Sequence, residues 1–322
     1  MDKKITFDIP YIRLCFRTEI LEHAQMPETK TAALRGGMGE MILKQNCVTD
    51  KNCGECRFKK ACVVMHTFYS SMEKKPAYVT GEESVGYLIE CADKRTEFAK
   101  GSRFEFSLVL FGDSIAFFNI YLQAFYQLGL AGIGRHRARF RILEVCNTQG
   151  KPIVCGNEVD MGRYQIETVE QYISQRKKRL RSEDGLWTLT FITPLSMKYQ
   201  QKYMDEFYAD ALVKGAARRV QMLDYYTGTE TDVPDFCEYP GIRWQMVRKE
   251  KVKRYSGTQD ARITLRGISG KVVFESMPED CLDYLIAGEL THVGRNSSFG
   301  FGKYVLRRER EDQTCIINNK YL

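Results

Sequence analysis

The chain has 322 residues, a net charge of +7, 43% hydrophobic residues and 28% charged residues, which is the composition of an ordinary folded protein. It excludes a disordered chain, and no run approaches the ~18 apolar residues of a membrane-spanning helix. The N-terminus has no apolar core of signal-peptide length, so we expect a cytoplasmic protein with no membrane partner. The length favours two domains, and the basic excess favours a polyanionic partner.

The first half is predicted to follow the order β-α-β-β-α-β. Period-two alternation of apolar residues predicts strands, and apolar residues at helical spacing predict helices. In chain order we expect a strand over 4–16, a helix over 29–45, strands over 85–92 and 103–112, a helix over 114–129 and a strand over 138–146. A glycine-containing turn at 130–137 leads into the last strand.

The second half repeats this order. We expect a strand over 186–198, a helix over 200–226, strands over 241–256 and 261–276 joined by the turn GTQD, a helix over 281–290 and a strand over 303–309. The sequence therefore predicts an α+β protein of two tandem ferredoxin-like (RRM-like) domains at 1–170 and 186–311, with a basic linker at 171–185 and a polar tail at 312–322. Because this fold hosts many functions, function must be argued from sites.

A cysteine cluster at 47–62 interrupts the first half. Cys47, Cys53, Cys56 and Cys62 have the spacing C-x5-C-x2-C-x5-C. In a reducing compartment such a cluster indicates metal binding more than disulfides, and four soft ligands fit tetrahedral zinc. We predict a structural Zn²⁺; an iron–sulfur cluster fits the same ligands, and four unligated thiols are the remaining alternative.

A glycine-rich turn precedes the last strand of each half. In the second turn, Gly294, Gly300 and Gly302 surround Arg295, Ser297 and Ser298, and Lys303 follows. Backbone N–H groups and short hydroxyls in such a turn suit close approach to a phosphate. The turn is not a nucleotide-binding P-loop, because the GK[ST] ending is missing. A tight turn that only needs positive φ is the alternative, but the repetition in both halves favours function.

Basic residues gather near the predicted last strand of the first half and in the long hairpin of the second. Arg135, Arg137 and Arg139 alternate, so on a strand they would share one face and meet an anion; a solvated edge strand is the alternative. Lys253 and Arg254 belong to a second basic stretch with interleaved aromatic residues, which is typical of stacking on unpaired bases. We expect these residues to bind RNA.

Several motifs carry a family resemblance over nearly the whole chain. They are LRGGMGEMI at 34–42, the cysteine cluster, GIGRHRARFRI at 132–142, FITPLSMK at 191–198, RYSGTQDARITLRGISGKVVF at 254–274 and THVGRNSSFGFGKYVL at 291–306. Their order and content resemble the CRISPR-associated repeat-processing endoribonucleases of the RAMP superfamily, in the subgroup with an N-terminal cysteine motif. In the closing block, Arg295 stands where the family usually has lysine.

The resemblance implies a reaction and its site. Proteins of this family cut CRISPR repeat RNA without a catalytic metal, by attack of a ribose 2′-hydroxyl on the adjacent phosphate, and so yield mature guide RNAs. Histidine can serve as the base or the acid of such a reaction. His292 matches the family block and is the first candidate, and His23, ahead of the first helix, is the second. Glu40 occupies a place where a basic side chain would suit catalysis better.

Two further functions are compatible with the sequence. The second hypothesis, after the endoribonuclease, is a noncatalytic RNA-binding subunit of the same superfamily in a CRISPR effector complex, which would bind repeat RNA without cutting it. The cysteines alone would also fit an iron–sulfur redox or sensing protein. A histidine that controls cleavage but not binding separates the first two, and a brown chromophore would indicate the third.

Overall fold

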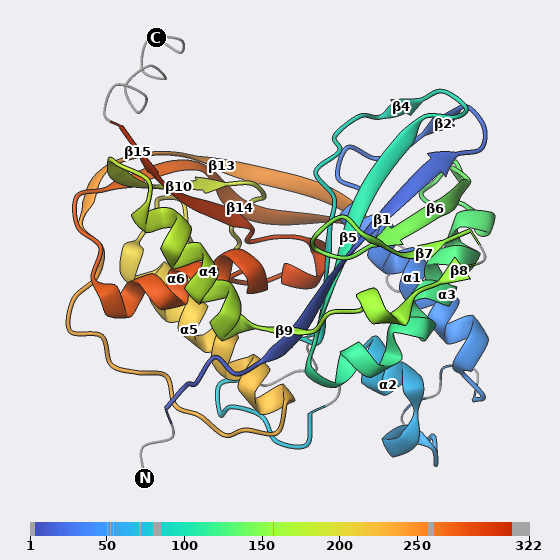
Figure 1. Cartoon of the computed structure of the whole chain (residues 1–322), viewed down its shortest axis with the longest axis horizontal. Coiled ribbons are helices and arrows are strands. Elements are labelled where there is room, and N and C mark those ends of the chain that lie inside the picture. Colours follow the sequence, from blue (N-terminus) through green and yellow to red (C-terminus); the bar gives the residue numbers. More distant parts are fainter. Residues whose placement is uncertain are drawn as a thin grey trace.

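The computed structural model describes residues 4–49, 51, 53, 55–70, 72–79, 85–156, 158–256 and 261–310. The expected turn at 257–260, the side chain of Arg254 and the tail at 312–322 lie outside the described residues. Two antiparallel sheets, each with its own helices, form the two halves of the molecule (Figure 1).

The first sheet is built around β1. In spatial order its strands are β3 (Tyr87–Glu90), β5 (Arg103–Phe111), β1 (Pro10–Ile20), β6 (Phe140–Cys146), β7 (Pro152–Cys155) and β8 (Glu158–Val159), and β9 (Glu167–Thr168) also pairs with β1. Its helices are α1 (Thr31–Asn46), α2 (Val63–Thr67) and α3 (Phe118–Ala131). On β1 the buried Leu14 and Phe16 alternate with the half-buried Arg13 and Cys15, so one face carries the helices and the other carries polar groups.

The second sheet has the order β13 (Ile242–Ser256), β14 (Ala261–Phe274), β10 (Leu186–Phe191) and β15 (Tyr304–Glu309). Its helices are α4 (Val169–Arg181), α5 (Ala209–Tyr226) and α6 (Glu279–Thr291). Short elements complete the chain: β2 (Ala24–Gln25), β4 (Glu97–Phe98), β11 (Lys198–Tyr199), β12 (Lys202–Tyr203), η1 (Lys59–Ala61), η2 (Gly112–Phe117), η3 (Met161–Arg163) and η4 (Ser297–Phe299). Both halves thus have the predicted β-α-β-β-α-β order, with the same spatial arrangement of the four main strands.

The segment predicted as a linker is the helix α4. A capping box between Thr168 and Gln171 begins it, and its buried Val169, Ile173 and Leu180 pack into the core of the second half. Arg176 donates two hydrogen bonds to the buried carboxylate of Glu289 on α6, at 2.9 and 3.0 Å. The many charges conceal the apolar stripe of this helix in the sequence, because they occupy its outer face.

Two other local expectations differ from the structure. The first strand begins at Pro10 and not at residue 4, and Phe7 has a φ of 58°, which breaks the extended run. Arg135 and Arg137 lie in a tight turn that the bridge between Ile133 and Ala138 closes, so they do not alternate on a strand. β6 begins only at Phe140.

The two halves share a core. Near one end, the face of the first sheet that its own helices leave uncovered is apolar. It contributes Leu88, Val109 and Phe111 to the same buried cluster as the helices of the second half. That end of the first sheet is therefore covered by the second half. Burial of such apolar area fixes the relation between the halves.

One buried acid in the second half gives a stability prediction. Asp224, near the end of α5, is 2% exposed and accepts a hydrogen bond from Thr231 Oγ1 at 2.7 Å. Burial raises its pKa to about 6, although the Thr231 hydrogen bond acts the other way. Between pH 4 and 6 the folded chain therefore holds a proton that the unfolded chain releases, and stability falls as the pH rises.

We expect Asp224→Asn to raise the free energy of unfolding at pH 7.5 by roughly 1–2 kcal/mol, and to have little effect at pH 4, where the wild-type acid is already protonated. Thermal unfolding at both pH values measures this. Asp235→Asn, at an exposed position, is the control and should change little at either pH. An equal shift at both pH values for Asp224→Asn would contradict the argument.

Candidate nucleic-acid interface

The glycine-rich turn of the second half is held in an unusual backbone conformation. It follows α6, and His292, at the end of that helix, has φ 56° and ψ 150°, a region that is costly for any residue except glycine. Gly294 and Gly302 have φ values of 88° and 76°, and a Cβ at Gly302 would collide with the carbonyl oxygen of Val293. The glycines of this turn are therefore required by its geometry.

The turn packs against the first half at the start of α1. Thr31 Oγ1 donates a hydrogen bond of 2.8 Å to the carbonyl oxygen of Phe299. The Arg35 guanidinium lies 4.2 Å from the centre of the Phe299 ring and 4.7 Å from that of Phe68. These contacts place the turn between the two halves and leave the side chain of Arg295 exposed.

A buried ionic cluster underlies the turn. Glu90, at the end of β3, is 7% exposed and forms ion pairs with Arg13 of β1 and with Lys303 Nζ, at 2.8 Å for the lysine. His292 is 0% exposed, with Nε2 3.0 Å from Glu90 Oε1 and Nδ1 3.0 Å from the carbonyl oxygen of Phe301. One carboxylate of the first half thus joins three cationic or polar groups, two of which belong to the second half.

The pKa values of this cluster follow from burial and charge. Burial acts to raise the pKa of the Glu90 carboxyl. The hydrogen bond from His292 and the charges of Lys303 and Arg13 outweigh this effect and hold that pKa well below its usual range. Burial lowers the pKa of His292 and that of Lys303, although Glu90 opposes both shifts.

The two predicted catalytic histidines are not brought together. His292 is buried in the cluster, whereas the side chain of His23 is 75% exposed at the bend after β1, 3.7 Å from Glu97. Along β1, Arg13 and Ile20 are separated by roughly 23 Å, at about 3.3 Å per residue. Since Arg13 contacts the cluster and His23 follows Ile20, the two histidines cannot face one phosphate in this arrangement.

The hairpin of β13 and β14 is the most extended basic feature. β10 pairs only with residues 271–274 of β14, so most of the hairpin projects beyond the sheet. On one face Lys251 lies directly opposite Arg266, and Lys253 lies opposite Thr264; all three cations are exposed. Like charges directly opposite across strands are unfavourable unless an anion meets them.

Within the described part of the chain, no carboxylate pairs with Lys251, Lys253 or Arg266; the neighbouring Lys249 pairs with Asp205 at 3.1 Å. We define these three residues as the basic hairpin face. Their arrangement provides three charges for a polyanion.

The segment Pro194–Ser196 connects the hairpin to the glycine-rich turn. Leu195 and Ile268 of β14 exchange backbone hydrogen bonds of 2.8 and 2.9 Å. On the other side, the Arg295 N–H donates to the carbonyl oxygen of Ser196 at 2.7 Å. The base of the hairpin and the phosphate-binding candidate Arg295 therefore flank one short segment.

The remaining predicted RNA-binding residues have varied surroundings. Arg135 and Arg137 are exposed in the first glycine-rich turn, while Arg139 forms an ion pair with Glu22 at 2.7 Å. In the second turn Gly294, Ser297 and Ser298 are half-buried, and the side chain of Lys303 is 20% exposed because it reaches into the ionic cluster. The first turn thus presents two guanidiniums, and the second presents Arg295.

The four cysteines lie between the end of α1 and the start of α2, and all are half-buried. Across the described residues, no three or more His, Cys, Asp or Glu side chains are placed to hold a metal ion. Zinc stays a prediction from the cysteine spacing.

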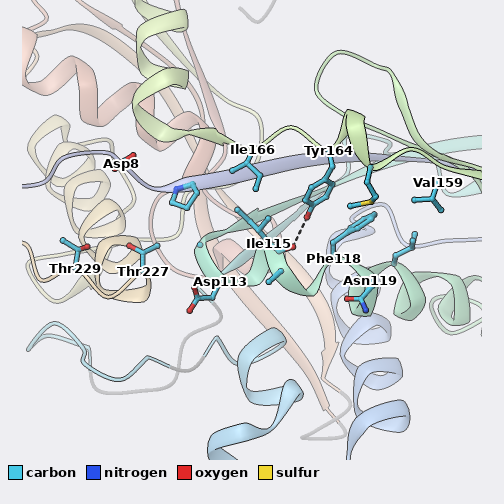
Figure 2. A pocket seen from close by; sticks show the side chains of 15 residues that line it. Asp8, Asp113, Ile115, Phe118, Asn119, Val159, Tyr164, Ile166, Thr227 and Thr229 are labelled. Atoms are coloured by element: carbon cyan, nitrogen blue, oxygen red, sulfur yellow. Dashed lines mark hydrogen bonds between the residues drawn. The ribbon is translucent and has the colours of Figure 1, made fainter.

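A groove of about 1020 Å³ lies elsewhere between the halves (Figure 2). Phe118, Met161 and Ile166 contribute apolar side chains, and Tyr164 closes one side by donating a hydrogen bond of 2.8 Å to the carbonyl oxygen of Ile115. The acidic groups that line it are Asp8 and Asp113. Carboxylates repel phosphate, so this groove is not part of the candidate interface.

Sequence reasoning missed the central carboxylate. Glu90 follows three apolar residues of β3, and an acid that continues a buried strand is a signal, since such a group requires cationic partners. Arg13 was missed because its partner Glu90 is 77 residues away, on a strand that does not adjoin β1. Arg266 was missed because its position opposite Lys251 depends on the register of the hairpin. Only the register reveals such pairs.

Two family models match the chain. Residues 9–169, half of the chain, match AF_1859_N, described as an N-terminal domain. Residues 189–304 match the CRISPR-associated endoribonuclease Cas6. No curated protein sequence matches, and no described helix is both long and apolar enough to cross a membrane.

Solved structures share the fold at low identity. The chain is similar to a partial Cas6-RT-Cas1–Cas2 complex with a TM-score of 0.58 and 12% identity, over 94% of this chain and 47% of that chain. The Cas6-RT-Cas1–Cas2 complex gives the same TM-score and identity, with 29% of that chain covered. A Cas6 product complex has a TM-score of 0.49 and 12% identity, over 93% of this chain and 99% of that one. The chain spans about half or less of the first two relatives.

Proposed function

We propose that this chain, which belongs to the RAMP-type family of proteins that process CRISPR repeat RNA, is an endoribonuclease that binds repeat RNA and cleaves it to mature guide RNAs. The observation that carries the proposal is the position of the glycine-rich turn. It presents the exposed Arg295 beside the base of a basic hairpin, and it is fixed from below by a buried ionic cluster.

The proposed chemistry needs no metal ion. A ribose 2′-hydroxyl attacks the adjacent phosphate, and the 5′-oxygen leaves, which gives a 2′,3′-cyclic phosphate and a 5′-hydroxyl. Negative charge grows on the nonbridging oxygens, and we assign its stabilisation to the Arg295 guanidinium with the hydroxyls of Ser297 and Ser298. The residues of the basic hairpin face bind flanking phosphates and set the register of the RNA.

His292 stays a candidate with a different role from the one first expected. Both of its ring nitrogens have partners and the side chain is fully buried. Direct proton transfer to RNA would require the turn to lift away from β3. We therefore propose that His292 positions the turn. The exposed His23 lies far along β1, beside Glu97, so it does not share a phosphate with Arg295 in this arrangement.

The proposal predicts cleavage in excess EDTA at one position of the chain's own repeat RNA, with a cyclic phosphate end. Arg295→Ala is expected to lower the single-turnover cleavage rate about 10²–10³-fold, as removal of one transition-state donor does, while RNA affinity falls less than tenfold. Arg103→Ala, at an exposed position of the first half, is the matched control. Cleavage that requires added metal would refute the mechanism.

One observation favours a second function, a noncatalytic RNA-binding subunit. Of the two candidate histidines, the one beside the turn is buried and the exposed one lies far along β1. In that case the chain binds repeat RNA tightly and leaves it intact. Either protein would deliver bound RNA to effector-complex proteins, and two similar solved structures contain Cas6 with other Cas proteins.

We also propose that Cys47, Cys53, Cys56 and Cys62 hold one structural Zn²⁺. The expected result is about one zinc per chain by metal analysis of the purified protein, lost in a Cys53→Ser/Cys56→Ser double variant. Cys237→Ser, at an exposed position of the second half, should keep the zinc. Iron together with acid-labile sulfide in the purified protein would show that the cysteines hold an iron–sulfur cluster instead of zinc. A wild-type protein without bound metal would overturn the proposed metal site.

A further inference from the structure

Among the residues that the structure describes, no helix lies on one face of the second sheet. In Figure 1, α4, α5 and α6 all lie on the same side of β13, β14, β10 and β15. The two tryptophans of the chain are on opposite faces of this sheet. Trp187, opposite Phe274, packs against the core on the helix side, whereas Trp244, opposite Val273, packs against neither core cluster.

The strand register assembles a row across the helix-free face. Trp244 pairs with Val273, Val273 with Thr188, and Thr188 with Arg307, so these four residues cross all four strands. Trp244 is half-buried, and Arg307 at the other end of the row is exposed. In the adjacent row Met246 is 42% exposed. Val273 and Thr188 in the middle of the row are buried, at 0% and 1% exposed, so the groups of these rows that reach the surface are the half-buried Trp244, Met246 and Arg307.

The charge of this face favours an anion. Two exposed guanidiniums lie on it, that of Arg307 and that of Arg248, which lies opposite Ser269. The carboxylates there are engaged: Glu309 pairs with Lys271, and Glu250 accepts a hydrogen bond from Ser269. A partner with flat apolar surfaces and negative charge therefore complements the face, and unpaired nucleotides have both properties.

We infer that the helix-free face binds single-stranded RNA, with an unpaired base stacked on Trp244 and its phosphates near Arg307 and Arg248. Bases within a duplex are already stacked on one another, so only unpaired nucleotides can use this surface. The inference rests on the proposed function for the identity of the polymer. It adds a second contact, separate from Arg295, for a segment of repeat RNA outside the cleavage position.

The experiment uses the full chain labelled with 5-fluorotryptophan, which gives one ¹⁹F resonance for each of its two tryptophans. Trp244→Phe assigns them. On titration with octaadenylate or octauridylate, the resonance of Trp244 is expected to shift and that of Trp187 to stay. Fluorescence anisotropy of the labelled oligonucleotides should show Trp244→Ala binding 10- to 100-fold more weakly, with Trp244→Phe within a few-fold of wild type.

The outcomes separate this inference from the proposed function. A shift at Trp187 alone, or oligonucleotide binding that Trp244→Ala leaves unchanged, would overturn the stacking. No oligonucleotide binding at low salt would overturn it too, and would favour a protein partner for this face. Absence of repeat cleavage by the wild type contradicts the nuclease proposal without affecting these readouts.

Discussion

Replacing Glu90 with alanine is expected to lower the free energy of unfolding by about 3–5 kcal/mol, the usual cost of removing one partner of a buried ionic group. The substitution leaves Lys303 and His292 buried near Arg13 without the carboxylate that joins them. Denaturant unfolding at pH 7 measures the change. Because His292 and Lys303 flank the glycine-rich turn, we also expect RNA cleavage to fall.

The pH dependence gives a second readout of the same carboxylate. The folded pKa of Glu90 is held below its usual value of 4.5, so its stabilising effect is present above that value and is lost as the pH falls through the folded pKa. Glu90→Gln should therefore weaken the acid sensitivity of the fold.

Glu105→Ala is the matched control for Glu90, since Glu105 belongs to the neighbouring strand and pairs with Arg17 at 3.3 Å but is 59% exposed. An exposed pair contributes less than about 1 kcal/mol. Equal losses for the two variants would show that the buried cluster has no special role.

Replacing the basic hairpin face by alanine, at Lys251, Lys253 and Arg266 together, is expected to weaken repeat-RNA binding about 10²- to 10³-fold at low salt. Each lost phosphate contact also removes about 0.7–0.9 from the slope of log affinity against log salt, so the slope should become shallower by about 2–3. Titrations at several salt concentrations measure both quantities.

The control for the hairpin is a triple alanine variant at exposed lysines of the first half, Lys94, Lys100 and Lys151. It removes the same number of charges, so it tests whether the position of the cations or the net charge of the protein determines the affinity for RNA. A hairpin variant with an unchanged salt slope would show that these cations do not contact phosphate.

Most of the element order could be predicted because it is local. Alternation in β1 and β5 and helical spacing in α3 are properties of neighbouring residues, and both halves carry them. The pattern did not predict α4, because the polar and charged residues of its outer face are more numerous than the apolar residues of its buried stripe. The turn at Arg135 and Arg137 escaped because a pattern of alternate arginines looks the same in a turn and in a strand.

The candidate site was predicted in part. Arg295 and the glycines are visible as a motif, since a turn with positive φ leaves its mark on residue choice. The role of Lys303 differs from expectation, because the partner that draws it inward, Glu90, is more than 200 residues away in the chain. The cysteine spacing indicates a metal, but this arrangement does not assemble the ligands.

Patterns among residues close together in the chain suffice to predict the two β-α-β-β-α-β units, the glycine-rich turns, the basic stretches and the family resemblance. Only the folded arrangement brings particular residues into one site. It buried His292 under the turn, separated it from His23, set Lys251 against Arg266, and placed the two tryptophans on opposite faces of one sheet. Register and the docking of two halves fix these relations, and no local pattern encodes them.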